Sequence, residues 1–365
     1  MISGNRQKLL VSFLTFALFL FSGFSYAQDH TEKEAEGKFN PGDLIIEHVS
    51  DNHSYHLFDY KGEAVAIPLP VIVYSEPQGL SVFSSARFEH GHASYEGYKL
   101  EDNKIVKVKE DNTIDEEAKV YDFSMTRNVV QMLLALFVLT WILISAANKY
   151  RKNGVSKAPS GMQNAIEVVV VFIRDEVAKV NLGHAYKKYM PYLLTVFFFI
   201  LINNIFGLIP GTANVTGNIA FTCVLAVISL IVILFSTNGH FWGHIFWPPG
   251  VPFLVKFILI PVEFAGIFIK PIALMIRLFA NMIAGHIVIT CFIMLIFIFG
   301  GMSKVAGIGF SPVSILFTVF IYFIEILVAF IQAFIFTNLT AVFIGQAREG
   351  NHEDSAAGHD DPVII

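Results

Sequence analysis

The chain has 365 residues, of which 54% are hydrophobic and only 15% are charged, and its mean hydropathy is +0.59. Soluble domains carry about 25% charged residues, and 36 phenylalanines would leave large apolar patches on a water-soluble globule. The composition therefore indicates a membrane protein. The net charge of −5 excludes the basic footprint of a nucleic-acid-binding protein, and two cysteines within apolar stretches give no disulfide framework.

Residues 1–27 are typical of a secretory signal peptide. Arg6 and Lys8 precede an apolar run over residues 9–24, and residues 25–27 are Ser-Tyr-Ala, a small-x-small cleavage pattern. The run is shorter than the ~20 residues that a membrane span needs. An uncleaved first span is the alternative.

Residues 28–122 are more polar than the rest of the chain. Alternating apolar stretches at residues 64–67 and 71–74 are separated by proline and glycine, as in short strands with turns between them. We predict a small β-rich domain, which is extracytoplasmic if the preceding signal is functional. Its histidines show no repeated ligand spacing and are interpreted as surface groups rather than a metal site.

The membrane part is expected over residues 123–347, and positive charges orient it. The apolar stretch 129–147 is followed at once by four basic residues, Lys149, Arg151, Lys152 and Lys157, which marks a cytoplasmic loop. Residues 160–188 mix apolar and charged positions, which favours an amphipathic helix on the cytoplasmic face. Two further spans are predicted at residues 192–209 and 219–235.

Two long apolar segments follow. As one helix, residues 251–299 would extend about 70 Å, against a hydrocarbon core of about 30 Å. This segment is therefore either a hairpin or one steeply tilted helix. The last segment, residues 314–345, is also long for a single span, and a polar, acidic tail at residues 348–365 follows it.

Four charged residues in the first long segment are seven residues apart: Lys256, Glu263, Lys270 and Arg277. On a continuous helix this spacing places them on one face. The two lysines could instead reach an interface while Glu263 pairs with a neighbour. Arg277 cannot lose its proton, and its burial in a membrane costs from ~3 to more than 10 kcal/mol. A structural arginine paired with a fixed acid is the alternative for this residue.

Three more polar residues follow. His286 is nine residues after Arg277, which is about 180° around a helix, so the two side chains cannot share a contact there. Glu325 and Gln332 are seven residues apart and share one face of the last segment. A buried carboxylate near a histidine can exchange protons near neutral pH, although a plain core histidine is the alternative for His286.

Residues 276–286, IRLFANMIAGH, resemble the signature of subunit a of rotary F-type ATP synthases, the membrane stator beside the rotating c-ring. The similarity extends over about residues 125–347 and includes Asn204, Gly207-Leu208-Ile209-Pro210, Glu263, Lys270-Pro271 and Gln332-Ala333-Phe334. The resemblance implies an all-α polytopic membrane fold whose last two helices are long, steeply tilted and wrapped beside the ring. It therefore selects a tilted helix over a hairpin.

The resemblance also implies roles for individual residues. Arg277 is expected to face the c-ring, to keep two half-channels separate and to promote proton release from each ring carboxylate. Asn281 and Gln332 are expected to help place Arg277. His286 and Glu325 are expected to line the half-channel that opens to the outside.

Glu263 is expected on the cytoplasmic access path, and Asn204 belongs to the same proton-translocating set. Some family members carry the acid at the position of His286 and the histidine at that of Glu325, so the pair is reversed here. Gly207 departs from members with an acid at this position, and we expect no proton role for it.

The implied function is that of a non-catalytic proton-channel subunit that couples proton flow to rotation and ATP synthesis. Its expected partners are the c-ring, the peripheral stalk subunit b, the remaining ATP synthase subunits and the lipid bilayer. It is expected in a bacterial inner membrane, with its C-terminus in the cytoplasm. We expect no cofactor, and no phosphate-cradling GxxxxGK[ST] motif occurs. A secondary transporter or self-contained channel is the alternative, but the internal repeats that it predicts are not evident.

Overall fold

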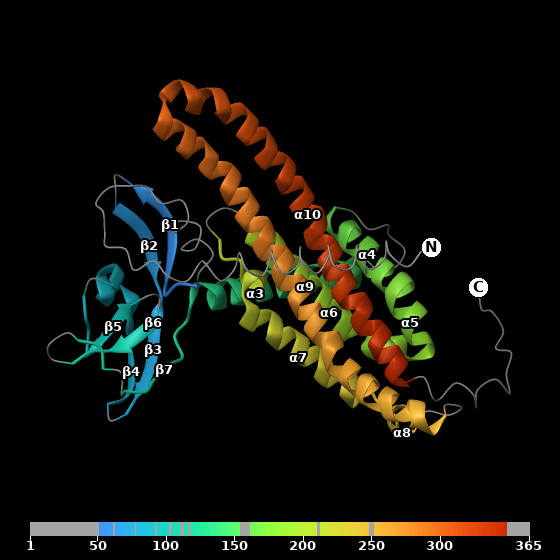
Figure 1. Cartoon of the computed structure of the whole chain (residues 1–365). Coiled ribbons are helices and arrows are strands. Elements are labelled where there is room, and N and C mark those ends of the chain that lie inside the picture. Colours follow the sequence, from blue (N-terminus) through green and yellow to red (C-terminus); the bar gives the residue numbers. More distant parts are fainter. Residues whose placement is uncertain are drawn as a thin grey trace, which may run out of the picture. The chain divides into compact units, whose positions relative to one another are not determined.

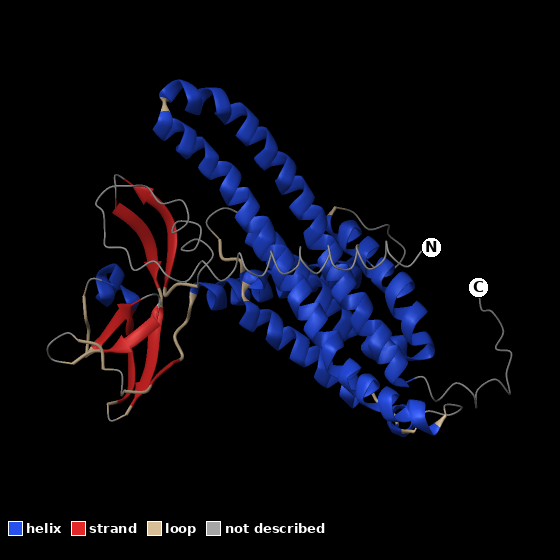
Figure 2. Ribbon diagram, viewed as in Figure 1, coloured by secondary structure: helices blue, strands red, loops and turns tan. Residues whose placement is uncertain are grey.

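The computed structural model describes residues 51–60, 63–76, 78–91, 93–101, 104–109, 113–115, 118–153, 161–209, 212–247 and 252–348. The expected signal peptide and the acidic tail beyond Arg348 lie outside these ranges. Figures 1 and 2 show strands in the first part of the described chain and helices in the rest.

Among the described residues, seven strands and one short helix precede the helical part: β1 (Ser54–Tyr60), β2 (Glu63–Pro68), β3 (Pro70–Ser75), β4 (Gly79–Ser84), η1 (Ser85–Gly91), β5 (Tyr98–Glu101), β6 (Lys104–Lys107) and β7 (Val120–Asp122). The strands pair antiparallel, with β3 between β4 and β7, β1 beside β2, and β5 beside β6. Val71 and Val73 of β3 are fully buried and pack with Phe88 and Tyr98. The alternating pattern therefore gives this part a small apolar core of its own.

Hydrogen bonds join the strand part to the first long helix, α3 (Arg127–Asn153). The backbone N–H of Arg127 donates to the carbonyl oxygen of Asn52 at 2.9 Å, and Asp51 Oδ1 accepts from the backbone of Asn128 at 3.1 Å. A carboxylate at this place satisfies a free N–H group of the helix N-terminus. The buried guanidinium of Arg127 donates to the carbonyl oxygen of Thr212 at 2.6 Å. The start of α3 is thus fixed to the loop after the next span.

The rest of the described chain is helical. After α3 come α4 (Met162–Phe172), the π-helical turn η2 (Ile173–Lys179), α5 (Val180–Leu182), η3 (Gly183–Ala185), α6 (Tyr186–Leu208), η4 (Val215–Gly217), α7 (Ile219–Phe235), α8 (Gly239–Phe246), α9 (Phe253–Met302) and α10 (Lys304–Arg348). Four stretches are long and apolar enough to cross a membrane: Arg127–Lys152, Met162–Leu208, Val255–Met302 and Lys304–Arg348. The 17-residue α7, which rises about 26 Å, is at the lower limit for a span.

The predicted elements agree with these bounds to different degrees. The span predicted at 219–235 coincides with α7, and those at 129–147 and 192–209 fall within or nearly within α3 and α6. The single amphipathic helix expected at 160–188 is interrupted, because Gly183 adopts a φ of 50° that ends α5. Such a positive φ is tolerated by glycine and strained for most other residues.

Within the long segment predicted at residues 251–299, the chain forms one continuous helix from Phe253 onward, so the hairpin interpretation is wrong. α9 has 50 residues and continues through Pro261 and Pro271 without a break. The chain reverses at Ser303, and α10 runs back beside α9 (Figure 1). Close to this turn a Cβ at Gly307 would lie 2.7 Å from the Cα of Gly300. Small residues therefore permit the two helices to approach closely here.

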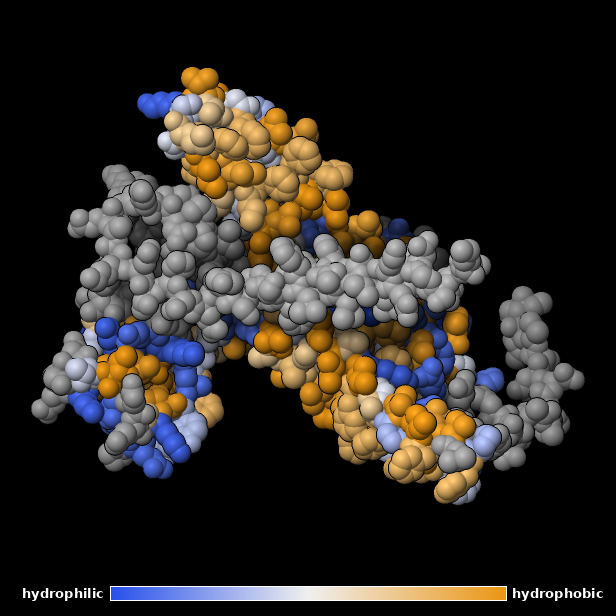
Figure 3. All heavy atoms as spheres, in the orientation of Figure 1, coloured by the Kyte–Doolittle hydropathy of each residue, from blue (hydrophilic) through white to orange (hydrophobic). Residues whose placement is uncertain are grey.

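The core of the helical part lies between α6, α7, α9 and α10. Its largest fully buried side chains include Phe197, Leu278 and Phe336. By contrast, much of the antiparallel α9–α10 pair carries exposed apolar side chains, such as Phe297 and Phe323. Figure 3 shows this apolar surface. Exposed apolar surface on long helices is what a bilayer or a membrane partner covers.

Replacing Gly345 with alanine should lower stability. A Cβ at Gly345 would lie 2.2 Å from the backbone oxygen of Asn181, so α5 and α10 would have to separate. Overpacking of this kind costs about 1–3 kcal/mol, more than the ~1 kcal/mol that alanine gains over glycine in a helix. Gly309→Ala is the matched control on α10, because nothing lies within 4 Å of its Cβ position. The measurement is the melting temperature of the purified complex. A midpoint for Gly345→Ala equal to that of the control would contradict this packing.

Candidate functional site

Arg277 lies on one flank of the stripe that α9 buries. The stripe consists of Ile267, Leu274, Leu278, Met282 and Ile289. Arg277 is about 100° around the helix from Leu278 and is half-buried. Within the described ranges, its guanidinium makes no hydrogen bond or ion pair. The alternative of an arginine paired with a fixed acid is therefore not found among these residues.

Glu325 of α10 lies directly against α9 beside His286. A Cβ at Gly285 would lie 2.1 Å from Glu325 Oε1, so only glycine leaves room for the carboxyl group at this position. Glu325 is 8% exposed, and its Oε2 has no hydrogen-bond partner within the described ranges. Buried polar atoms of this kind require an explanation, such as an ordered water or a functional role.

The His286 side chain contacts the end of α6. Its Nε2 lies 2.6 Å from the carbonyl oxygen of Gly207. Because a carbonyl oxygen only accepts, Nε2 carries the proton in this contact. His286 lies on the opposite flank of the α9 stripe from Arg277, as their nine-residue spacing predicts. At neighbouring positions of α9, Gly285 thus packs against the carboxyl group of Glu325 from α10, and His286 contacts a backbone carbonyl of α6.

Asn204 completes this polar cluster from α6. Its side chain is fully buried, and Nδ2 donates to the carbonyl oxygen of Ala329 at 3.2 Å. Ala329 is one turn after Glu325 on the same face of α10. Gln332, 6% exposed, follows on that face, as its spacing predicts. Among the described residues, no hydrogen bond joins Gln332 or the half-buried Asn281 to Arg277.

Sequence reasoning missed Asn214, which connects the end of α6 to α9. Asn214 Nδ2 donates to the carbonyl oxygen of Met282 at 3.2 Å, and Oδ1 accepts from the backbone of Gly217 at 3.0 Å. A Cβ at Gly207 would lie 3.1 Å from Asn214 Oδ1. Gly207 therefore supplies close packing and a carbonyl acceptor.

Ser314 and Thr318 of α10 were also missed. Ser314 donates to the carbonyl oxygen of Phe292 on α9, and Thr318 Oγ1 is buried without a partner among the described residues. They precede Glu325 by eleven and seven residues, which places them on the same face. This spacing is the signal that could have identified them.

The other three charged residues of the predicted polar stripe lie nearer the start of α9. The ammonium group of Lys256 lies 4.1 Å from the ring centroid of Trp247, and that of Lys270 donates to Gln346 of α10 at 3.1 Å. Glu263 is exposed and has no ion-pair partner within the described ranges. The alternative in which Glu263 pairs with a neighbour is therefore not observed there.

No group of three or more histidine, cysteine or acidic residues in the described part of the chain could hold a metal ion. The groups gathered between α6, α9 and α10 include a carboxyl and an imidazole, which are groups that can exchange protons, and polar side chains. The fold and the site together define a multi-pass membrane protein with ionisable groups between long helices.

Comparisons with known proteins identify the family. Residues 129–345 match the ATP synthase A chain family, and residues 44–123 match a domain of unknown function (DUF8433). ATP synthase subunit a of Chloroherpeton thalassium is 48% identical over 66% of this chain and 71% of the relative. ATP synthase subunit a of Chlorobium phaeobacteroides (strain DSM 266) is 42% identical over 90% of this chain and 83% of the relative.

The chain belongs to the family of subunit a of F-type ATP synthases. Members are the non-catalytic, proton-translocating membrane subunit of that complex. The resemblance of residues 276–286 to this family is thereby confirmed.

Proposed function

We propose that this chain provides two offset half-channels to a rotating ring. Protons enter from the outside past His286 and Glu325, load a carboxylate on the ring and travel nearly one revolution. They leave past Glu263 to the cytoplasm, and Arg277 keeps the two paths apart. Each elementary charge that crosses 100 mV releases about 2.3 kcal/mol, so several protons drive one step of ATP synthesis.

The observation that carries this proposal is the unpaired guanidinium of Arg277. A cation on a membrane helix is costly unless an opposite charge faces it, and no acid of the described chain does so. A carboxylate on the c-ring would supply that charge. The polar groups support the two paths, because Glu325 and His286 lie beyond Arg277 along the chain and Glu263 lies before it.

We further propose that the strand part lies outside the cytoplasm and that the end of α10 faces the cytoplasm. Basic side chains gather at one end of the helices, where Arg348 donates to the Tyr189 hydroxyl at 3.2 Å and Lys270 contacts Gln346. Excess positive charge marks the cytoplasmic side. The strands join α3 at its opposite end from Lys149 and Lys152.

The length of α9 supports a steep tilt. Its 50 residues rise about 75 Å, more than twice the thickness of the hydrocarbon core. A tilted α9–α10 pair would present a long side to the ring. The complex would also include the peripheral stalk subunit b and the remaining ATP synthase subunits, in a bacterial inner membrane.

Thiol accessibility tests the two paths. Single-cysteine variants Glu263→Cys and Glu325→Cys are made in a chain whose Cys223 and Cys291 are serine. A membrane-impermeant thiol reagent should modify position 263 in inverted vesicles and position 325 in right-side-out vesicles. Leu278→Cys, at a position that is 1% exposed, is the control and should react from neither side. Reaction of positions 263 and 325 from the same side would refute two offset half-channels.

A further inference from the structure

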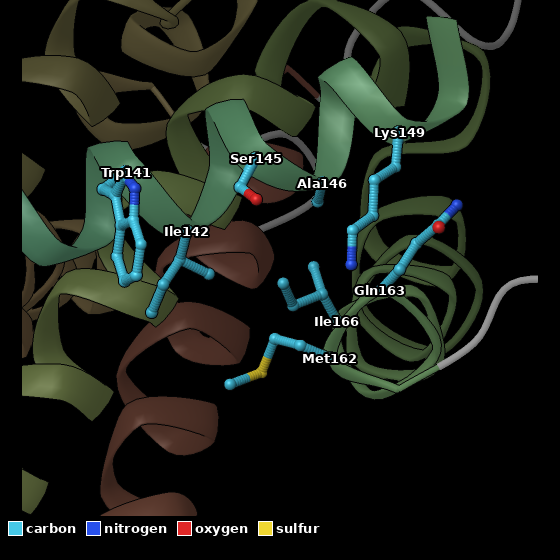
Figure 4. Close-up of a pocket in the computed structure, with 8 residues that line it drawn as sticks. All are labelled: Trp141, Ile142, Ser145, Ala146, Lys149, Met162, Gln163 and Ile166. Atoms are coloured by element: carbon cyan, nitrogen blue, oxygen red, sulfur yellow. The ribbon is translucent and has the colours of Figure 1, made fainter. Parts of the chain in front are cut away.

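A pocket lies between α3 and α4, away from the proton-transfer groups. It has a volume of about 200 Å³ and lies between Ile142, Ser145 and Lys149 of α3 and Met162 and Ile166 of α4. Figure 4 shows the apolar side chains converging from the two helices, with the Lys149 side chain extending from α3 toward α4. The pocket is therefore apolar in its interior and cationic at one end.

The pocket continues along α3. Trp141, Ser145 and Lys149 line both this pocket and an adjoining hollow that extends from Phe137 to Lys152. Phe137 and Lys152 are 15 residues apart, which is about 22 Å along the helix axis. This is a large part of the hydrocarbon thickness of about 30 Å. A long apolar chain could therefore follow α3 inward from its basic end.

The cations at this end have no partner among the residues that the structure describes. Lys149 and Lys152 are exposed, and neither makes an ion pair or hydrogen bond within the described ranges. The nearby carboxylate of Glu167 accepts a hydrogen bond from the Tyr150 hydroxyl instead. Two unneutralised ammonium groups therefore lie at the end of a membrane-spanning helix, where lipid headgroups are found.

The cationic and the apolar groups of the site lie at different depths along α3. Trp141 is eight residues before Lys149, which is about 12 Å deeper along the helix, and its side chain is well exposed. The site thus requires a ligand with a negative charge at one end and an apolar chain at the other. An anionic phospholipid has both in one molecule, whereas a neutral lipid lacks the net charge.

We infer that the pocket between α3 and α4, together with the adjoining hollow along α3, binds an anionic phospholipid. The phosphodiester lies against Lys149 and Lys152, with the Ser145 hydroxyl available to donate a hydrogen bond, and an acyl chain lies along Trp141 and Phe137. The site is independent of the proton path. If no lipid binds here, the roles proposed for Arg277, His286 and Glu325 are unaffected. If those roles are refuted, the inference of a lipid site is unaffected.

Photo-crosslinking of the purified, reconstituted complex tests this inference. Phosphatidylglycerol with a diazirine in its acyl chain is titrated, and the labelled peptides from α3 and α4 are quantified by mass spectrometry. Phosphatidylcholine with the same acyl chains is the neutral probe. Wild-type α3 and α4 should be labelled at saturation by the anionic probe and only at background by the neutral one. Excess inorganic phosphate should not compete, because a free anion lacks the acyl chain.

A control variant at a basic residue outside the pocket distinguishes a specific lipid site from a general attraction between basic residues and anionic lipids. Lys149→Gln with Lys152→Gln should weaken labelling about 30-fold, because each ammonium group held against the bound anionic headgroup contributes roughly a factor of five. Arg151→Gln removes a charge from the same turn, outside the pocket lining, and should leave labelling within about twofold.

Four outcomes would overturn the inference. The first is equal labelling of the wild type by the anionic and neutral probes, a result that does not depend on the folding of any variant. The second is an equal loss in Arg151→Gln and the double lysine variant. The third is competition by inorganic phosphate, which would assign the site to a free anion. The fourth is crosslinking of the site to another subunit in place of lipid, which would assign it to a protein partner.

Discussion

Arg277→Ala should abolish ATP-driven proton pumping while the complex still assembles. The guanidinium is half-buried and has no partner in the described chain, so its removal breaks no internal ion pair. Its removal instead impairs the step at which a ring carboxylate passes from one half-channel to the other. Removal of one preorganised charge-stabilising group typically costs about 100- to 1000-fold in rate. The measurement is ATP-driven quenching of a pH-sensitive dye in inverted vesicles, with assembly checked by immunoblot.

Lys256→Ala is the matched control for the arginine substitution. Lys256 is a cation on the same predicted face of α9, but it is partnered by the ring of Trp247. We expect the control to keep most of the pumping activity. Normal pumping in Arg277→Ala, or equal losses in the two variants, would contradict a specific role for Arg277.

The double exchange His286→Glu with Glu325→His should recover more activity than either single change. The carboxyl of Glu325 lies against Gly285, the residue before His286, and the proposed outer half-channel contains both side chains. Neighbouring residues typically couple by 0.5–3 kcal/mol. The double variant should therefore exceed the activity expected from two independent losses by about 2- to 150-fold. The same dye-quenching assay measures it.

Exchange of two distant groups provides the comparison. Glu263 and His286 are 23 residues apart on α9, or about 35 Å along its axis. Glu263→His with His286→Glu should therefore show no recovery beyond the product of the single losses. If the His286 and Glu325 exchange also shows none, a shared half-channel is refuted.

Hydropathy and charge were sufficient to predict most of the helical elements. The apolar run of α7 is bounded by Asn218 and Ser236, so its ends are visible in the sequence. The long α9 was ambiguous because length alone is compatible with a hairpin or with one continuous helix. The turn is at Ser303, after Gly300-Gly301, rather than at Pro261 or Pro271.

The site was predictable only within each helix. Seven-residue spacing correctly placed Glu325 and Gln332 on one buried face of α10. It could not give the register of α10 against α9, because that register depends on close packing between helices. Gly285 determines this approach, and its sequence position alone gives no indication that a carboxyl group packs against it.

The hydrogen bonds that join the α6 region to other helices could not be predicted from the sequence either. Asn204 was identified through a motif, but its bond to the carbonyl of Ala329 depends on the packing of α6 against α10. Asn214 follows a short loop and bonds to Met282, 68 residues later in the chain. Contacts between segments so far apart in the chain leave no periodic pattern in a single sequence.

A side-chain-resolved map of the assembled complex in its membrane tests the central role of Arg277 most directly. We expect the guanidinium to lie at the depth of the ring carboxylates, facing the ring, with no acid of its own chain within 4 Å. A guanidinium at the water boundary, or one bound to a fixed acid of this chain, would contradict the role in proton transfer proposed for it.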